Sequence, residues 1–156
     1  MRRGVIILLG LSALALSACS GAGSSGTPSQ QLHTWVVGTG LRASTTAILT
    51  DMAHVNAALG SQQPNAVQTT CSVMANDADA ANSNLPSPNE QVSTLLSDAY
   101  SQVGIAANDC FIALKVPAKL TAYRAHEAQA RGLFAEAATI IEAQTGQRIL
   151  PAVATP

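Results

Sequence analysis

The chain has few aromatic and few charged residues: aromatic side chains make up 3% and charged side chains 11% of its 156 residues. Proteins that bind nucleic acid need clustered lysine and arginine to neutralise phosphates, but here 8 basic residues are outnumbered by 9 acidic ones. This balance argues against nucleic acid as a partner. The hydrophobic fraction of 47% is largely alanine, which favours helices with small side chains over a core of bulky ones.

Long apolar runs are scarce as well. The most apolar stretch, from Val5 to Ala18, has 14 residues and falls short of the roughly 20 that a membrane-spanning helix needs. It follows a basic start, Arg2-Arg3, and ends in small residues, which is the three-part layout of a secretory signal. We therefore expect an exported protein from which residues 1–18 are removed.

The stretch ends in Leu16-Ser17-Ala18-Cys19, which resembles the lipobox of bacterial lipoproteins. This resemblance implies a thioether-linked diacylglycerol on Cys19, cleavage before it and acylation of the new amino terminus. It implies a membrane partner through that lipid, and a location on the extracytoplasmic face of the cell membrane. The remainder, rich in alanine, serine and threonine, looks like small envelope lipoproteins of high-GC actinobacteria, although no specific family is recognisable in it.

The expected mature chain suits a single domain. Removal of 18 residues from 156 leaves 138, which is enough for one core, and the loss of Arg2 and Arg3 changes the formal charge from −1 to −3. Residues 19–27 are rich in glycine and serine and predict a flexible tether. Residues 147–156 form a C-terminal tail beyond Gly146, a residue type that ends many helices.

Proline placement predicts the helices. Proline is tolerated at the first helical position and poorly inside a helix. Four prolines each open a long proline-free segment: Pro28, Pro64, Pro88 and Pro117. Two of these starts also match a capping box, Thr27 with Gln30 and Ser87 with Glu90. Short connections favour antiparallel neighbours, so residues 28–146 predict an all-α, up-down-up-down antiparallel four-helix bundle.

Apolar periodicity supports these helices, because apolar residues recur at alternating steps of four and three. The second and third helices repeat Val67, Cys71, Met74, Ala78, Ala81 and Leu85, and Val92, Leu96, Ala99, Val103, Ala106, Cys110 and Ala113. The first and fourth repeat Leu41, Thr45, Ile48, Met52, Val55 and Leu59, and Leu120, Tyr123, Ala130, Leu133, Phe134, Ala137, Ile140 and Ile141.

Cys71 and Cys110 both fall on these apolar seams and remain as a pair once Cys19 carries the lipid. Disulfides persist in exported proteins, so we expect a Cys71–Cys110 bond, the alternative being two buried free thiols. Counted from the turn near Pro86, the two positions differ by about 13 Å along the helix axes. The loop and the helix stagger must absorb this difference.

Trp35–Ala43 superficially resembles a strand followed by the glycine turn of a dinucleotide-binding fold. No later strand pattern and no acidic residue at the required spacing accompany it. We interpret the segment as part of the first helix, with a weak point at Gly38 and Gly40 because glycine costs roughly 1 kcal/mol relative to alanine in a helix.

Metal motifs are incomplete in this chain. His126-Glu127 begins like the zinc protease motif, but Ala130 stands where the second histidine is required, and His33 and His54 are distant in sequence. The acidic segment from Asp77 lacks the glycine and the final glutamate of a calcium loop, because Pro88 occupies the twelfth position. We therefore expect no metal and no cofactor.

No catalytic motif stands out either, since the chain has no Gly-x-Ser-x-Gly turn. Basic residues gather early in the last helix, offset by Glu127 and Glu136: Lys115, Lys119, Arg124 and Arg131. We interpret them as a solvated face, the alternative being a site for anionic lipid headgroups or a partner.

The expected function is a non-enzymatic, lipid-anchored envelope protein with a helical binding or interaction module and an envelope protein as its candidate partner. The alternative is a carrier or sensor of a small apolar ligand or lipid held between the bundle helices. Close packing of small side chains leaves little room for a large internal cofactor.

Overall fold

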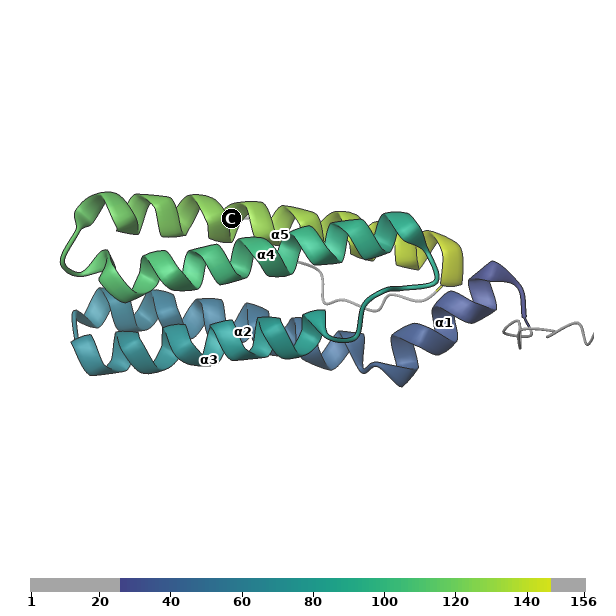
Figure 1. The fold of residues 1–156 in the computed structure, drawn as a ribbon, viewed down its shortest axis with the longest axis horizontal. Coiled ribbons are helices and arrows are strands. Elements are labelled where there is room, and N and C mark those ends of the chain that lie inside the picture. The colour runs from purple at the N-terminus through teal and green to yellow at the C-terminus, as the bar shows by residue number, and fades with distance from the viewer. Residues whose placement is uncertain (1–25, 147–156) are drawn as a thin grey trace, which may run out of the picture.

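The computed structural model describes residues 26–146, which form helices joined by short connections (Figure 1). Five helices occur in this part of the chain: α1 (Pro28–Gly38), α2 (Leu41–Ser61), α3 (Pro64–Asn82), α4 (Glu90–Ala113) and α5 (Pro117–Thr145). The described residues contain no strand, so the all-α prediction is confirmed. The predicted number of four helices was wrong. Cys19, residues 1–18, most of the tether 19–27 and the tail 147–156 lie outside the described residues.

The additional helix arises from a break at Thr39 and Gly40. Thr39 ends α1, and its hydroxyl donates to the Trp35 carbonyl at 2.8 Å. Gly40 then adopts a left-handed conformation with φ 63° and ψ 30° before α2 begins. A residue with a Cβ is strained there, whereas glycine is not. The weak point expected from the two glycines is therefore a true helix boundary, placed at Gly40, while Gly38 stays helical.

The first predicted capping box is confirmed. The Gln30 N–H donates to Thr27 Oγ1 at 3.3 Å, and the Thr27 N–H donates to Gln30 Oε1 at 2.8 Å. Pro64 and Pro117 begin α3 and α5, as their placement predicted. At these ends proline loses no hydrogen bond, because the first N–H groups of a helix have no intrahelical acceptor.

The second predicted capping box was wrong. Helix α4 begins at Glu90, and Asn89 caps it by accepting the Val92 N–H at 2.9 Å. The Ser87 hydroxyl instead accepts the Asn89 N–H at 3.0 Å. This local turn competes with helical capping by Ser87 and keeps Pro88 outside the helix.

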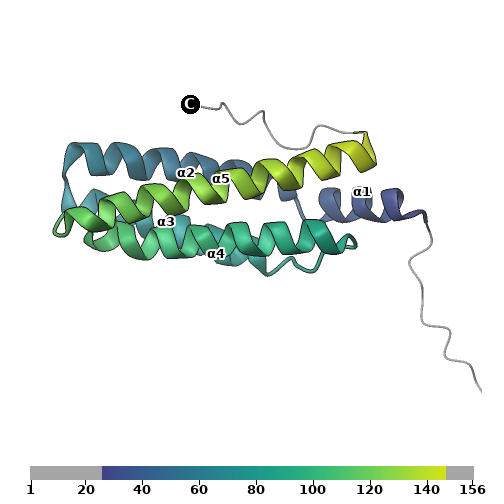
Figure 2. The ribbon, with the colours of Figure 1, turned by 90° about the horizontal axis from the view of Figure 1, so that it is seen from above.

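The four long helices lie side by side, and consecutive ones run in opposite directions (Figures 1 and 2). Helices α4 and α5, with 24 and 29 residues, outreach α2 and α3, with 21 and 19. Helix α1 lies beside this extra length. Its Ser29 hydroxyl donates to the Gln144 carbonyl at 2.6 Å, and its Trp35 Nε1 donates to the Asn84 carbonyl at 3.3 Å. Helix α1 thus lies against the last turns of α5 and the connection that follows α3.

The predicted seams form the core. The seam residues of α2 and α4 are buried, and so are those of α3 from Val67 to Ala81. On the last helix the largest buried side chains are Tyr123 and Phe134, and the Phe134 ring meets Tyr100 of α4 edge-on at 5.6 Å between centroids. The expected seam residues Ala130, Ala137 and Ile141 are buried as well. Four expected seam residues are only partly buried: Leu85, Leu120, Leu133 and Ile140.

The predicted disulfide is confirmed. Cys71 of α3 and Cys110 of α4 are bonded, fully buried and 6.1 Å apart between their Cα atoms. The connection 83–89 runs along the molecule before α4 begins, so α4 starts beyond the end of α3 (Figure 1). This offset absorbs the stagger that the two cysteine positions require.

Among the helices of residues 26–146, none combines the length and the hydropathy that crossing a membrane requires.

Candidate functional site

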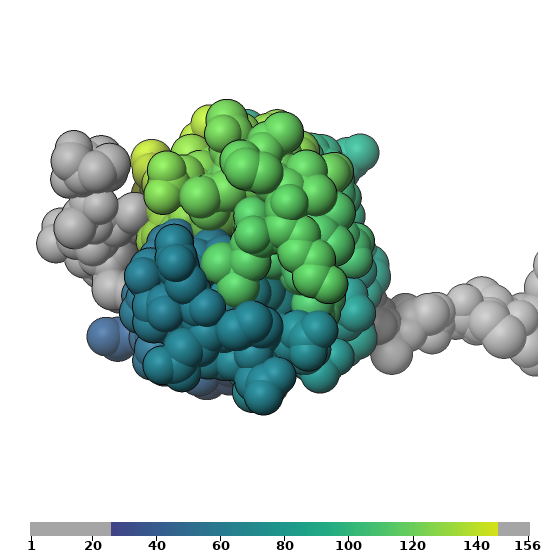
Figure 3. Space-filling model, turned by 90° about the vertical axis from the view of Figure 1, so that its left-hand side faces the viewer, coloured from purple at the N-terminus to yellow at the C-terminus, as the bar shows by residue number. Residues whose placement is uncertain are grey.

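The candidate site lies at the end of the molecule remote from α1. The turn between α2 and α3 and the turn between α4 and α5 form this end, which we call the distal end (Figure 1). Figure 3 views it directly, with the α2–α3 turn in dark teal below and the α4–α5 turn in green above. The described chain begins at residue 26, next to α1, so it enters the fold at the opposite end.

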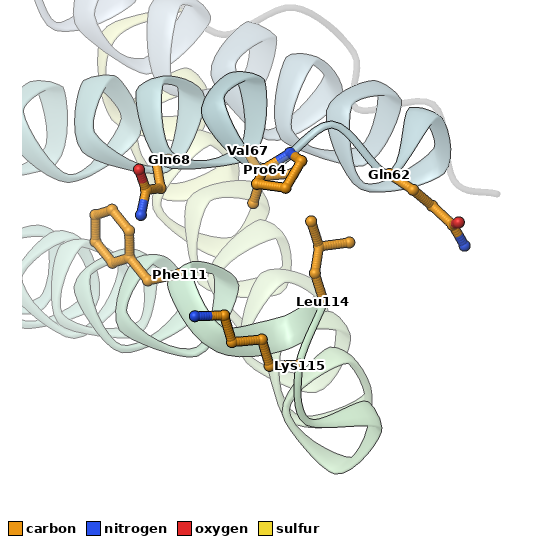
Figure 4. Close-up of a pocket in the computed structure, with 7 residues that line it drawn as sticks. All are labelled: Gln62, Pro64, Val67, Gln68, Phe111, Leu114 and Lys115. Carbon is orange, nitrogen blue, oxygen red and sulfur yellow. The ribbon is translucent and has the colours of Figure 1, made fainter.

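A groove opens at the distal end, between the start of α3 and the end of α4. Its volume is about 400 Å³. The residues that line it are Gln62, Pro64, Val67, Gln68, Phe111, Leu114 and Lys115. In Figure 4, Gln68 faces Phe111 and Leu114 extends toward Pro64, whereas the Gln62 side chain points away. We call this feature the distal groove.

Exposed apolar side chains concentrate beside the groove. Single exposed hydrophobics are ordinary on a protein surface, but a group of them marks a binding site. Five of the large hydrophobic side chains exposed in the described region lie within one short segment, each between 36% and 42% exposed: Ile105, Phe111, Ile112, Leu114 and Val116. We call this group the α4 patch. Phe111 and Leu114 belong to both the patch and the groove.

Sequence reasoning missed this site, although a signal was present. The seam through Val103, Ala106 and Cys110 correctly identified the buried face of α4. Ile105 and Ile112 fall outside that seam, so on a helix they must face elsewhere. An apolar residue out of phase with the buried stripe is the pattern that predicts an exposed patch.

The basic residues expected to form one solvated face have different environments. Lys119 donates to Asp109 at 2.7 Å, and Arg131 donates to Glu127 at 2.7 Å. Both carboxylates are buried, so two of the four basic residues on the expected solvated face bind buried acidic partners. Lys115, in contrast, lines the distal groove and takes part in none of the ion pairs formed among residues 26–146.

His126 is held between α4 and α5. Its Nδ1 lies 2.7 Å from Gln102 Oε1, and its Nε2 lies 3.9 Å from Asp109 Oδ2. The Lys119 ammonium donates to the other oxygen of Asp109, Oδ1, so the buried carboxylate has a charged partner from α5, and the Gln102–His126 contact joins the same two helices. We therefore interpret this cluster as structural: its polar contacts hold α4 and α5 together.

Glu127, adjacent in sequence, belongs to a second network that joins α5 to α2. Asn56 Nδ2 donates to both carboxylate oxygens of Glu127 at 3.1 Å, and Arg131 Nε donates to Oε1 at 3.0 Å. The Tyr123 hydroxyl donates to the Met52 carbonyl at 3.4 Å. Burial first, and then the nearby Glu127 carboxylate, raise the pKa of Tyr123 above its usual value. The incomplete zinc motif therefore consists of two residues with separate structural partners.

Asp51 and Asp77 form a carboxyl pair between α2 and α3. Asp51 is only 9% exposed, and its Oδ2 has no hydrogen-bond donor among the described residues. Burial, followed by the hydrogen bond and the negative charge of Asp77, raises the pKa of Asp51 to about 6, while His54 acts in the opposite sense. Two adjacent carboxyl groups are stable when they share a proton, because one then donates to the other. This pair was not foreseen from the sequence.

Among residues 26–146, no group of three or more histidine, cysteine, aspartate or glutamate side chains is placed to hold a metal ion. His54 is exposed on α2 and takes no part in the cluster formed by His126, Gln102 and Asp109.

The chain matches no protein-family model, and comparisons with curated proteins and with solved structures returned no match. The functional argument therefore depends on the geometry of this chain alone.

Proposed function

We propose that this protein is a lipid-anchored component of the cell envelope that presents a helical interaction module and has no catalytic activity. The module is the antiparallel four-helix bundle of α2 to α5, with α1 as a separate helix over one end. One observation supports the proposal above the others: the α4 patch and the distal groove lie at the end opposite the point where the chain enters the fold.

Attachment through Cys19 suits this geometry. A tether of about ten residues holds the body roughly 15–20 Å from its anchor on average. Helix α5, with 29 residues, extends about 44 Å from one end to the other at 1.5 Å per residue. The distal end is thereby presented away from the membrane that holds the lipid, where a second envelope protein can reach it.

The anchor is tested by Cys19→Ala, with Ser20→Ala as a matched control. We expect the Cys19 variant to lose its acyl groups and leave the membrane fraction, and the control to remain there, as measured by fractionation and intact-protein mass. A Cys19 variant that stays membrane-bound with normal processing contradicts the proposal.

The interaction module is tested with a photo-cross-linking amino acid at Ile112, in the α4 patch. Ser97 provides the control, since it is exposed on the same helix but lies toward the other end. We expect a defined adduct of higher mass from position 112 and none from position 97. If position 112 yields no adduct in its own envelope, the interaction proposal fails.

The second candidate is a carrier or sensor of a small apolar ligand or lipid. The volume of the distal groove, about 400 Å³, and its apolar side chains favour it. Native mass spectrometry of protein purified from its own envelope should then show a bound small molecule. Detection of unliganded polypeptide alone contradicts this candidate.

A further inference from the structure

We infer that the distal groove and the α4 patch together bind an apolar segment of a partner protein, and that a carboxylate of this segment pairs with Lys115 Nζ. This inference rests on the proposed function and specifies the chemistry of the partner.

The shape of the surface argues for a protein segment. Phe111 and Leu114 line the groove and also belong to the exposed patch, so the two features are continuous. An occupant that fills the groove therefore extends onto the outer face of α4, over Ile112 and Ile105. A single small molecule does not cover both the groove and the α4 patch. A peptide segment can cover both, because alternate or helical spacing places several of its apolar side chains along one face.

Charge specifies the partner further. Lys115 is the charged residue of the groove lining. The facing part of α3, from Pro64 to Asn76, contains no charged residue, and α4 from Ala99 to Ala113 contains only Asp109, which already binds Lys119. The end of α2 from Met52 to Ser61 contributes no carboxylate either. An apolar occupant would desolvate the Lys115 ammonium without compensation, unless it brings an acidic group.

A second copy of the chain does not meet this requirement. A two-fold contact through the groove places the same lysine from both copies at one interface, where like charges repel. A head-to-tail contact with the acidic residues Glu90 and Asp98 requires opposite ends to meet. In copies anchored through Cys19, the short tether keeps the α1 end close to the membrane, so the distal end of one copy and the opposite end of the next lie on average at different heights.

A lipid surface is also a poorer match. One lysine near an anionic membrane contributes about 1 kcal/mol, and a flat bilayer surface does not fill a groove between two helices. A partner segment uses both the groove and the patch.

The test uses the full lipidated chain in its own envelope, with the photo-cross-linking residue at Gln68 on the groove wall. We expect an adduct whose cross-linked peptide contains apolar residues and an aspartate or glutamate. That peptide, once synthesised, should bind the purified full chain, and Lys115→Glu should weaken its dissociation constant on the order of tenfold. Lys115→Arg should stay within about twofold, because it preserves the charge. Phe111→Ser should weaken binding about tenfold through the lost apolar contact.

Salt and charge exchange complete the test. Raising the salt concentration should weaken peptide binding by the wild-type chain and leave binding by Lys115→Gln unchanged, since screening acts on the charge pair. A peptide with its acidic residue changed to lysine should bind Lys115→Glu better than it binds the wild type. Helical circular dichroism should be equal in all Lys115 variants, because this side chain is exposed and makes no ion pair among the described residues.

Four outcomes overturn the inference: an adduct with the mass of a lipid, an adduct with a second copy of this chain, a cross-linked peptide without an acidic residue, and a peptide whose affinity Lys115→Glu leaves unchanged. The third and fourth leave the proposed interaction function intact. Absence of an adduct from Ile112 overturns the proposed function, and the inference with it. Absence of an adduct from Gln68 alone overturns only the inference.

Discussion

The wild-type chain is expected to become less stable as the pH rises from about 4 to about 7, and the Asp51→Asn variant is expected to lack this pH dependence. Burial and the neighbouring Asp77 raise the pKa of Asp51 from 3.8 to about 6 in the folded chain. Between these two values the folded protein retains a proton that the unfolded chain releases. The stabilisation is fully present below the unfolded pKa and is lost as the pH rises through the folded pKa.

The magnitude follows from the shift. A difference of about 2 pKa units at 1.36 kcal/mol per unit corresponds to about 3 kcal/mol of unfolding free energy. Asparagine at position 51 cannot ionise, and its amide can donate to Asp77 at every pH. The unfolding free energy of the variant minus that of the wild type should therefore increase by up to about 3 kcal/mol from the acidic to the neutral end of this range.

Urea unfolding at several pH values measures this difference. Asp98→Asn provides the matched control, because Asp98 is an exposed aspartate on α4, and its difference from the wild type should not vary in the same way. Asp77→Asn should also flatten the wild-type dependence, since Asp77 is the second cause of the raised pKa of Asp51. The reasoning is refuted if the gap between Asp51→Asn and the wild type stays constant within about 0.5 kcal/mol from about pH 4 to pH 8.

Three further predictions concern the scaffold. Cys71→Ser opens a loop that spans a sequence separation of 39 and should lower the unfolding free energy by about 4 kcal/mol; an unchanged urea midpoint would contradict this. Gly38→Ala should stabilise by about 0.5–1 kcal/mol, since a Cβ there meets no atom within 4 Å, whereas Gly40→Ala should destabilise by about 1 kcal/mol at its φ of +63°; equal effects would refute the assigned helix break. Burial raises the pKa of Tyr100 to about 12 and that of Tyr123 further, so near-ultraviolet titration of the folded chain should show no tyrosinate step near the ordinary value of about 10.

Local chemistry in the chain predicted most of the helical framework. Proline at the first helical turn and the Thr27 capping box act through neighbouring residues, so they can be recognised without knowledge of distant contacts. The seam of Cys110 and its neighbours follows from helical periodicity alone. The failure at Ser87 was also local: Asn89 offered a competing cap two residues later, and both satisfy the same short-range rules.

The candidate site could not be predicted in the same way. Whether Phe111 is covered or exposed depends on how far α3 extends beside α4, and that is set by the stagger around the disulfide and the connection 83–89. The same holds for Lys115. Lys119, four residues later, forms an ion pair with Asp109 of α4, whereas Lys115 lines the distal groove. Identical side chains four residues apart thus have different roles because of tertiary contacts.

The amino-acid order alone sufficed for the helical class and the weak point near Gly40, because each depends on backbone preference or on a period repeated along one helix. It also sufficed for the Cys71–Cys110 pair, because only these two cysteines remain once Cys19 carries the lipid. Packing of the helices against one another decided the rest. It brought Asp51 against Asp77, separated His126 from its neighbour Glu127, and left an apolar end with one lysine uncovered. These features join residues that are distant in the chain, so their energies exist only once the helices have come together.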